Sequence, residues 1–239
     1  MTLRTLRSLA AAVALAAGCA ATPMRAWAPA SQVAIARDAA RFAPAPLAAL
    51  LARHGEALDG GAVEPFTDAD WRRHVKNDDG SGTLDQSALA ELDGAIAALR
   101  ARRPADEIAR RFGRLSHWAA DLNNPLNSSS RDRSEARYFR DYFLYADAVR
   151  PRFAVVFYRA GDPRRRVEVA ALERAALERG RRFYRSIGDE YRRIGFANGL
   201  LSFDDKSTAF AVAALAYSHA VSDAAHLLRY AWVAASSKE

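Results

Sequence analysis

The amino-acid sequence predicts an all-α fold made of a single multi-helix domain, and three observations support this class. Alanine, leucine, arginine and glutamate dominate the composition, and all four are strong helix formers. Apolar residues recur at the three- and four-residue spacing of an amphipathic helix, most clearly at Leu89, Leu92, Ile96 and Leu99. The only candidate strand is the short and isolated segment 152–158.

Length and composition exclude several other classes of protein. The 239 residues, half of them hydrophobic, suffice for one buried core and exclude a disordered chain. The single cysteine, Cys19, excludes a disulfide scaffold and a cysteine-rich zinc ribbon within one chain. The formal net charge is +7, but only three of the 35 basic residues are lysines. A strong excess of arginine over lysine together with abundant alanine is typical of a codon bias. We therefore do not take the arginine content as evidence for nucleic-acid binding.

The first 26 residues have the layout of a secretory signal. Arg4 and Arg7 precede an apolar run from Leu9 to Ala17, which is followed by small residues. This run is shorter than the roughly 20 apolar residues that a membrane span needs. The later alanine-rich stretches are interrupted by charged residues, so we expect no transmembrane span after the signal. We predict export, with residues 1–26 as the signal segment and residues 27–239 as the helical domain.

Two processing sites are compatible with this signal segment. Residues 15–19 resemble a bacterial lipoprotein box, in which Cys19 would be lipidated and become the first residue of a lipid-anchored protein. Cleavage after Ala26 would instead leave Trp27 as the first residue of a periplasmic or secreted protein. The sequence leaves both routes open.

The start of the domain is predicted to form two helices. Ser31 is the expected N-cap of a helix that runs to Phe42. Pro46 suits the first turn of a second helix, which is expected to run to about Leu58. Gly60–Gly61 is expected to end this second helix.

A short helix, a turn and a long helix are predicted next. Thr67 and Asp70 form a capping-box-like start to a short helix that reaches Val75. Segment 77–82 is rich in Asn, Asp and Gly, which indicates a turn. A long amphipathic helix is expected to begin at Asp85 or Thr83 and to run to Arg102.

Four further helices complete the predicted fold. They are expected over residues 104–124, 134–149, 167–194 and 207–233. The helix over 134–149 is rich in aromatic side chains, which we expect to pack in the core. Stacking on bases or contact with acyl chains is the alternative for these aromatic side chains.

His117 and Asp121 form the first pattern that points to chemistry. They lie four residues apart in the helix predicted over 104–124, and hence on the same helix face. An imidazole and a carboxylate placed in this way can bind one metal ion together, or they can form a hydrogen bond with each other. Their spacing alone leaves both alternatives open.

The residues around this pair resemble a known motif. The zinc-dependent phospholipase C and single-strand nuclease superfamily carries a helix that reads Gly-x-x-x-His-aromatic-x-x-Asp, followed by a turn that ends Pro-(Leu/Met)-His. This chain matches the motif, at the family spacing, at Gly113, His117, Trp118, Asp121, Pro125 and Leu126. The family is all-α and exported, and its mature chain begins with a tryptophan.

The resemblance implies a phosphodiesterase that holds a cluster of three zinc ions in a helical cleft. By this resemblance His117 and Asp121 bind zinc, and Trp27 does so if it is the N-terminal residue. The family also has an aspartate and a histidine about fifteen residues apart before the central motif. Asp59 and His74 have that separation and are therefore candidate metal ligands.

Several metal ligands of the family are replaced in this chain. Asn127 stands where the family has a histidine after the Pro-Leu turn, Gln32 replaces the histidine near the N-terminus, and residues 131–145 contain no histidine. Amides are poor zinc ligands beside imidazole or carboxylate. We therefore expect at most one zinc site, in which Asp70 is a rival to Asp59 as the earlier carboxylate.

Three functions follow from these observations as alternatives. The first is an exported zinc-dependent hydrolase of phosphate esters with a reduced metal centre, which acts on phospholipid or single-stranded nucleic acid and makes peripheral membrane contact. The second is a non-catalytic exported helical protein, descended from that fold, that binds a ligand or partner. The third is a surface lipoprotein of unrelated role, favoured if Cys19 is lipidated.

Two other groups of polar residues have both a structural and a functional interpretation. His219, Asp223 and His226 share one face of the last helix, where they either hold helices together or form a second metal or substrate-orienting site. Arg164–Arg166 and Arg181–Arg182 are either solvated or form a docking patch for a phosphate-bearing substrate or anionic lipid.

Overall fold

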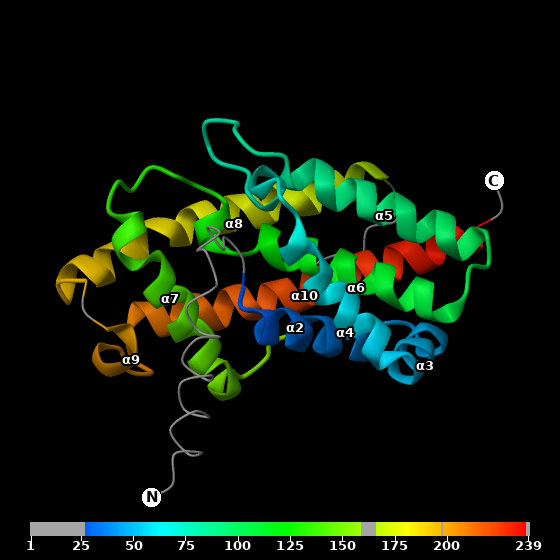
Figure 1. Cartoon of the computed structure of the whole chain (residues 1–239), viewed down its shortest axis with the longest axis horizontal. Coiled ribbons are helices and arrows are strands. Elements are labelled where there is room, and N and C mark those ends of the chain that lie inside the picture. Colours follow the sequence, from blue (N-terminus) through cyan, green and yellow to red (C-terminus); the bar gives the residue numbers. More distant parts are fainter. Residues whose placement is uncertain (1–26, 159–165, 197, 238–239) are drawn as a thin grey trace, which may run out of the picture.

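The computed structural model describes residues 27–158, 166–196 and 198–237. These residues form α-helices and short 3-10 helices without a strand, which confirms the all-α prediction (Figure 1). The predicted signal segment 1–26 and Arg164–Arg165 lie outside the described residues. The elements are α2 (Pro29–Arg41), α3 (Ala45–Arg53), α4 (Gly55–Val63), η1 (Glu64–Thr67), η2 (Trp71–His74), α5 (Leu84–Arg100), α6 (Ala105–Leu122), η3 (Pro125–Asn127), α7 (Glu135–Val149), η4 (Arg150–Arg152), α8 (Arg166–Arg193), α9 (Gly199–Ser202) and α10 (Thr208–Ser236).

Helix α6 lies at the centre of the domain. It packs against α4 and α5 and also contacts α2, α10 and α8 (Figure 1). Every residue from Leu115 to Leu122 is buried, so this part of α6 has no face toward solvent. Three of these buried residues, Ser116, His117 and Asp121, are polar, and the fold must supply partners for them because a buried polar group without a partner is costly.

Helices α4 and α6 approach each other closely at two glycines. A Cβ atom on Gly61 would lie 2.0 Å from the carbonyl oxygen of Arg110, and one on Gly113 would lie 2.1 Å from that of Leu58. The prediction that Gly60–Gly61 ends a helix was wrong, because α4 continues through both glycines to Val63. Gly61 lies where the α6 backbone touches α4, and the contact leaves no room for a Cβ atom.

Other helix boundaries also differ from the sequence prediction. The helix expected over 46–58 is interrupted at His54, which caps both α3 and α4 and pairs with Asp106. Ser31 is not an N-cap: it is buried inside α2, and its hydroxyl donates to Asp147 at 2.7 Å. The cap of η2 is Asp70, whose carboxylate accepts from the main-chain N–H of Arg72.

Segment 152–158, the candidate strand, is not a strand. After η4 it runs without regular structure beside α10, where the main-chain N–H groups of Val156 and Tyr158 donate to the hydroxyls of Ser218 and Ser222. Side-chain hydroxyls on a helix thus replace the partner strand that these N–H groups would otherwise need.

The aromatic helix α7 packs in the core, as expected. Tyr138, Tyr142 and Tyr145 are each at most 3% exposed, and they contact Tyr191 of α8 or Phe203. The core interpretation of these aromatic residues is therefore confirmed. No described helix is both long enough and apolar enough to span a membrane.

Glu173 of α8 is a buried carboxyl group that should make stability depend on pH. Its side chain is 3% exposed, and burial together with the charge of Asp85 raises its pKa to about 8. Between about pH 4.5, the pKa of this carboxyl in the unfolded chain, and about pH 8, Glu173 is protonated in the folded chain and ionised in the unfolded chain. The free energy of unfolding therefore falls as pH rises through this window.

We expect Glu173→Gln to remove this part of the pH dependence. The neutral amide resembles the protonated carboxyl, so the variant should exceed the wild type in unfolding free energy at pH 8 by about 4 kcal/mol. Urea unfolding at pH 5, 6.5 and 8 measures this difference. Parallel pH profiles for the two proteins would show that Glu173 is ionised in the folded state.

Candidate metal centre

Three side chains that the sequence analysis singled out meet inside the domain. His74, at the end of η2, and His117 and Asp121, on α6, each offer one ligand atom, and these three atoms all lie within 4.8 Å of one another. His117 and Asp121 are fully buried, and His74 is 8% exposed. The i, i+4 pair on α6 therefore faces a third ligand that comes from a distant part of the chain.

The distances between the ligand atoms are close to those of a tetrahedral metal site. The Nε2 atom of His117 lies 3.2 Å from Oδ2 of Asp121 and 3.4 Å from Nδ1 of His74. Ligands about 2.0–2.1 Å from a tetrahedral zinc ion are separated by about 3.3 Å. His74 Nδ1 and Asp121 Oδ2 are only 2.7 Å apart, a hydrogen-bond distance, so this pair must open by about 0.6 Å to admit a metal ion.

Main-chain carbonyls fix the orientation of both imidazole rings. The Nδ1 atom of His117 lies 2.8 Å from the carbonyl oxygen of Ala62, and the Nε2 atom of His74 lies 3.1 Å from that of Pro65. Each ring thus donates one N–H away from Asp121 and directs its other nitrogen toward the carboxylate. Metal-binding histidines usually have this outer hydrogen bond, which fixes the tautomer that binds the metal.

In the absence of a metal ion, His74 and Asp121 shift each other's pKa toward the charged forms. Burial lowers the pKa of His74, but its hydrogen bond to Asp121 and the charge of that carboxylate raise it more, so the net shift is upward. Burial raises the pKa of Asp121, but the charge and hydrogen bonds of His117 and His74 outweigh this and lower it. A metal ion would need neutral His74, so its binding would release a proton.

Gln32 of α2 extends the polar group at the site. Its Nε2 atom donates to Oδ1 of Asp121 at 2.9 Å, while its Oε1 atom is buried without a hydrogen-bond partner in the described part of the chain. An orphaned buried oxygen beside a His–His–Asp group fits a site that is completed by another species, such as a metal ion or its bound water.

The two candidate carboxylates that precede His74 do not belong to the group. Asp59 is not part of the group, because its carboxylate pairs with Arg37, whose Nε donates at 2.9 Å. Asp70 pairs with Arg72 on the surface and is not a partner of His74. The ring of Trp27 is buried, and its Nε1 donates to the carbonyl of Ala120, so the start of the described chain packs on α6 one residue from Asp121.

Asn127, which stands at a position where the resembled family has a histidine, is also buried. Its Nδ2 and Oδ1 atoms have no hydrogen-bond partner among the described residues. Its carbonyl accepts from the main-chain N–H of Lys76 at 2.8 Å, which ties this turn to the segment directly after His74. The amide is therefore held inside the fold with two unsatisfied polar atoms.

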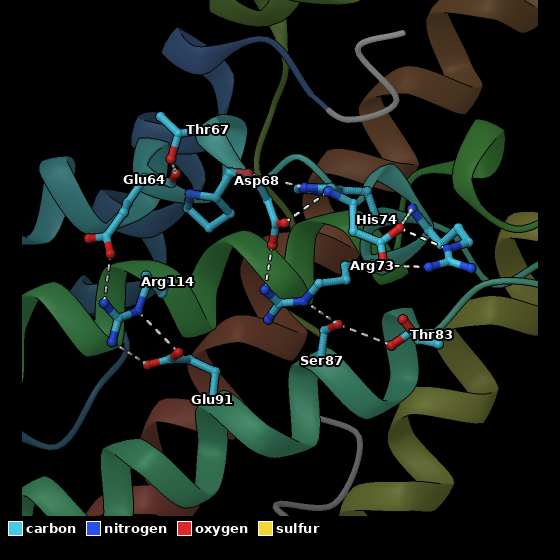
Figure 2. A network of polar contacts seen from close by, with 12 residues as sticks. Glu64, Thr67, Asp68, Arg73, His74, Thr83, Ser87, Glu91 and Arg114 are labelled. Carbon is cyan, nitrogen blue, oxygen red and sulfur yellow. Dashed lines mark hydrogen bonds and ion pairs between the residues drawn. The ribbon is translucent and has the colours of Figure 1, made fainter. Parts of the chain in front are cut away.

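A network of ion pairs holds the segment that carries His74 (Figure 2). Arg73 pairs with Asp68, and its Nε lies 3.4 Å from the hydroxyl of Ser87 on α5. Arg114 on α6 donates to Glu64 of η1 at 2.9 Å and to Glu91 of α5 at 3.1 Å. These links connect η1 and η2 to α5 and α6, which positions a segment without a regular α-helix of its own.

The sequence analysis missed the groups that orient and cover the ligands. The carbonyls of Ala62 and Pro65 carry no residue-type signal, because every residue has a carbonyl. The ring of Phe66 packs edge-on against His117 with ring centroids 5.0 Å apart, and Trp118 lies 4.9 Å from the ring of His74. Among these groups only Gln32 had a signal in the sequence, because it stands where the resembled family has a histidine.

The second histidine group, on α10, serves packing. Asp223 forms an ion pair with Arg179 of α8 and accepts from Asn123 at 2.9 Å. His219 stacks on Tyr158, and burial together with the charge of Arg179 lowers its pKa to about 4. These contacts join α10 to α6, α8 and segment 152–158, which agrees with the structural interpretation of this group.

The fold and the site together define an all-α protein with a buried His–His–Asp group that could hold a metal ion. Comparison with models of known protein families finds no match, and a search of curated proteins finds no similar sequence.

Proposed function

We propose that this chain is an exported helical protein that binds one zinc ion through His74, His117 and Asp121, and that the ion stabilises the fold rather than acting in catalysis. The observation that carries this proposal is the convergence of three ligand atoms whose histidines already have their outer hydrogen bonds. Two imidazoles and one carboxylate form a ligand set that zinc commonly takes in proteins.

The burial of the site supports a structural role for the metal. His117 and Asp121 are 0% exposed, and Phe66 and Trp118 pack against the histidine rings. A phosphate ester must reach the metal before it can be hydrolysed, and such a substrate is much larger than water. The arrangement therefore favours the non-catalytic alternative from the sequence analysis over a phosphodiesterase.

One observation favours the phosphodiesterase as a second candidate. Three protein ligands leave the fourth position of a tetrahedral zinc ion for water, as in catalytic sites, whereas structural sites usually have four protein ligands. A bound zinc ion would there supply Lewis-acid stabilisation of the phosphoryl oxygens. Phospholipid or single-stranded nucleic acid would be the substrate, and η1, which covers His117 through Phe66, would have to move to admit it.

Elemental analysis of protein exported and processed by a bacterial host tests the proposal. We expect one zinc ion per chain, a higher midpoint of thermal unfolding with zinc than after chelation, and no chelator-sensitive hydrolysis of bis(p-nitrophenyl) phosphate. Mass spectrometry of the same protein reports whether the mature chain begins at Trp27 or at lipidated Cys19.

The outcomes separate the two candidates. Zinc with chelator-sensitive hydrolysis that is lost in His117→Ala would replace the structural role with the phosphodiesterase. A folded chain that takes up no zinc when zinc is supplied would overturn both the structural and the catalytic candidate. The His–His–Asp group would then be an internal ion pair.

A further inference from the structure

A hollow rich in arginine lies on the surface beside α8. It has a volume of about 580 Å³, opens to solvent, and is lined by α8, by the segment after η3 and by the turn after η2. Its charged lining consists of four arginines and two aspartates, a formal excess of two positive charges: Arg131, Arg181, Arg185, Arg192, Asp78 and Asp132. None of these residues belongs to the His–His–Asp group, so the hollow is a separate feature.

Arg181 is held in place at this hollow by main-chain carbonyls. Its Nε donates to the carbonyl of Ser128 at 3.2 Å, and its Nη2 lies 3.4 Å from the carbonyls of both Lys76 and Asn77. Carbonyls orient a guanidinium without neutralising its charge. Among the described residues no carboxylate forms an ion pair with Arg181, so a half-buried, oriented positive charge lines the hollow.

The wall that carries Arg181 is closely packed. A Cβ atom on Gly180 would lie 2.6 Å from the hydroxyl oxygen of Ser128, so α8 touches the segment after η3 at this point. Tyr184, one turn further along α8, donates to Glu135 and accepts from the main-chain N–H of Asp132 at 3.1 Å. This wall of the hollow is therefore positioned before any ligand arrives, which lowers the entropy cost of binding.

The remaining arginines differ in how far their charge is compensated. Arg131 pairs with Asp78, and Arg192 donates to Asp132 at 2.8 Å. Arg185 is 87% exposed, and its Nε lies 3.8 Å from Asp189. This contact is weak, so the guanidinium can turn toward a ligand. Two of the four arginines thus balance the two lining aspartates. Asp189, which does not line the hollow, accepts from Arg192 at 2.6 Å and partly compensates Arg185. Arg181 therefore provides the uncompensated charge, and Arg185 adds to it.

We propose that this hollow binds the phosphoryl group of a phosphate monoester. Such a group carries nearly two negative charges at neutral pH, which matches the excess charge, and guanidinium forks donate paired hydrogen bonds to phosphate oxygens. The volume exceeds that of a phosphate ion and leaves room for a small organic substituent. A water-soluble phosphate ester and the headgroup of an anionic lipid share this chemistry.

Isothermal titration with inorganic phosphate and with glycerol 3-phosphate tests the proposal. We expect both to bind the wild type, and Arg181→Gln to weaken binding about tenfold or more. Arg182→Gln is the matched control, because it removes the same charge from an exposed neighbour that does not line the hollow. Tighter binding of the ester than of phosphate would indicate a site for esterified phosphate, and equal binding a site for the free ion.

A second variant guards against a loss of folding, because Arg181 also ties two loops together. Arg185→Gln changes an 87% exposed side chain that cannot affect the fold strongly, and it should weaken binding about threefold. Co-sedimentation with vesicles that contain phosphatidic acid distinguishes the two sources of the phosphoryl group. If the ligand is a lipid headgroup, the wild-type protein should sediment with the vesicles and Arg181→Gln should not. The proposal is overturned if phosphate and its ester fail to bind, or if Arg182→Gln weakens binding as much as Arg181→Gln.

Discussion

Asp121→Asn should abolish zinc binding and lower the free energy of unfolding of the zinc-free protein by about 3 kcal/mol. The change removes the carboxylate that both histidines approach, at 2.7 Å from His74 and 3.2 Å from His117. Without that carboxylate, burial lowers the pKa of His74, so the ring becomes neutral and the buried ion pair is lost. Removing one partner of a buried pair is strongly destabilising.

The pH of this measurement follows from the sign of the His74 shift. Its pKa is raised in the folded state, so the stabilisation from the His74–Asp121 pair is fully present below the unfolded pKa of about 6.5 and is lost as pH rises through the folded pKa. Thermal unfolding followed by circular dichroism at pH 6 should therefore show the largest effect, a decrease in Tm of about 10 °C. Zinc content is measured at neutral pH, where zinc competes better with the proton.

Asp59→Asn is the matched control for this change. It replaces the other aspartate that the resemblance made a candidate ligand, but that residue pairs with the exposed Arg37. Zinc content should remain unchanged, and the unfolding free energy should fall by no more than about 1 kcal/mol. Zinc retained in Asp121→Asn, or lost in Asp59→Asn, would contradict the assignment of the metal ligands.

Gly61→Ala should lower the unfolding free energy by about 3 kcal/mol, because overpacking at a rigid contact forces the backbone to move. The added Cβ would lie 2.0 Å from the carbonyl oxygen of Arg110, so α4 and α6 would have to separate. This separation would also disturb the candidate metal centre, since the carbonyl of Ala62, the next residue, accepts from Nδ1 of His117. We expect zinc affinity to fall together with stability, as measured by urea unfolding and zinc titration.

The neighbouring glycine provides the control for this prediction. A Cβ on Gly60 would lie 3.7 Å from the end of the Arg110 side chain, which is an ordinary contact. Alanine is the better helix former in a helix interior, so Gly60→Ala should be neutral or stabilise the protein by up to about 1 kcal/mol. Equal effects of the two substitutions would show that α4 and α6 are not in close contact at Gly61.

The helices of this protein could be predicted because helical periodicity is a local property. The stripe from Leu89 to Leu99 predicted α5 within two residues at each end. Helix ends were less predictable where another part of the chain determined them. Gly61 has the composition of a helix end, but it lies in the middle of a contact between two helices, and the sequence does not show that contact.

The candidate metal centre was partly predictable for the same reason. His117 and Asp121 lie four residues apart on one helix, so their placement on one face followed from helix geometry alone. The identity of the third ligand depended on a contact between residues 43 or more positions apart. The separation of about fifteen residues in the resembled family made both Asp59 and His74 candidates, and only His74 lies in the group.

Local sequence patterns predicted the all-α class, most of the helices, and the placement of an imidazole and a carboxylate together on α6, because these depend on interactions within a few residues. Long-range packing places His74 in the group, keeps Asp59 out of it, and directs the carbonyls of Ala62 and Pro65 at the rings. These features depend on how closely α4, η1 and η2 approach α6. That approach is set by small residues and ion pairs distributed over the whole domain.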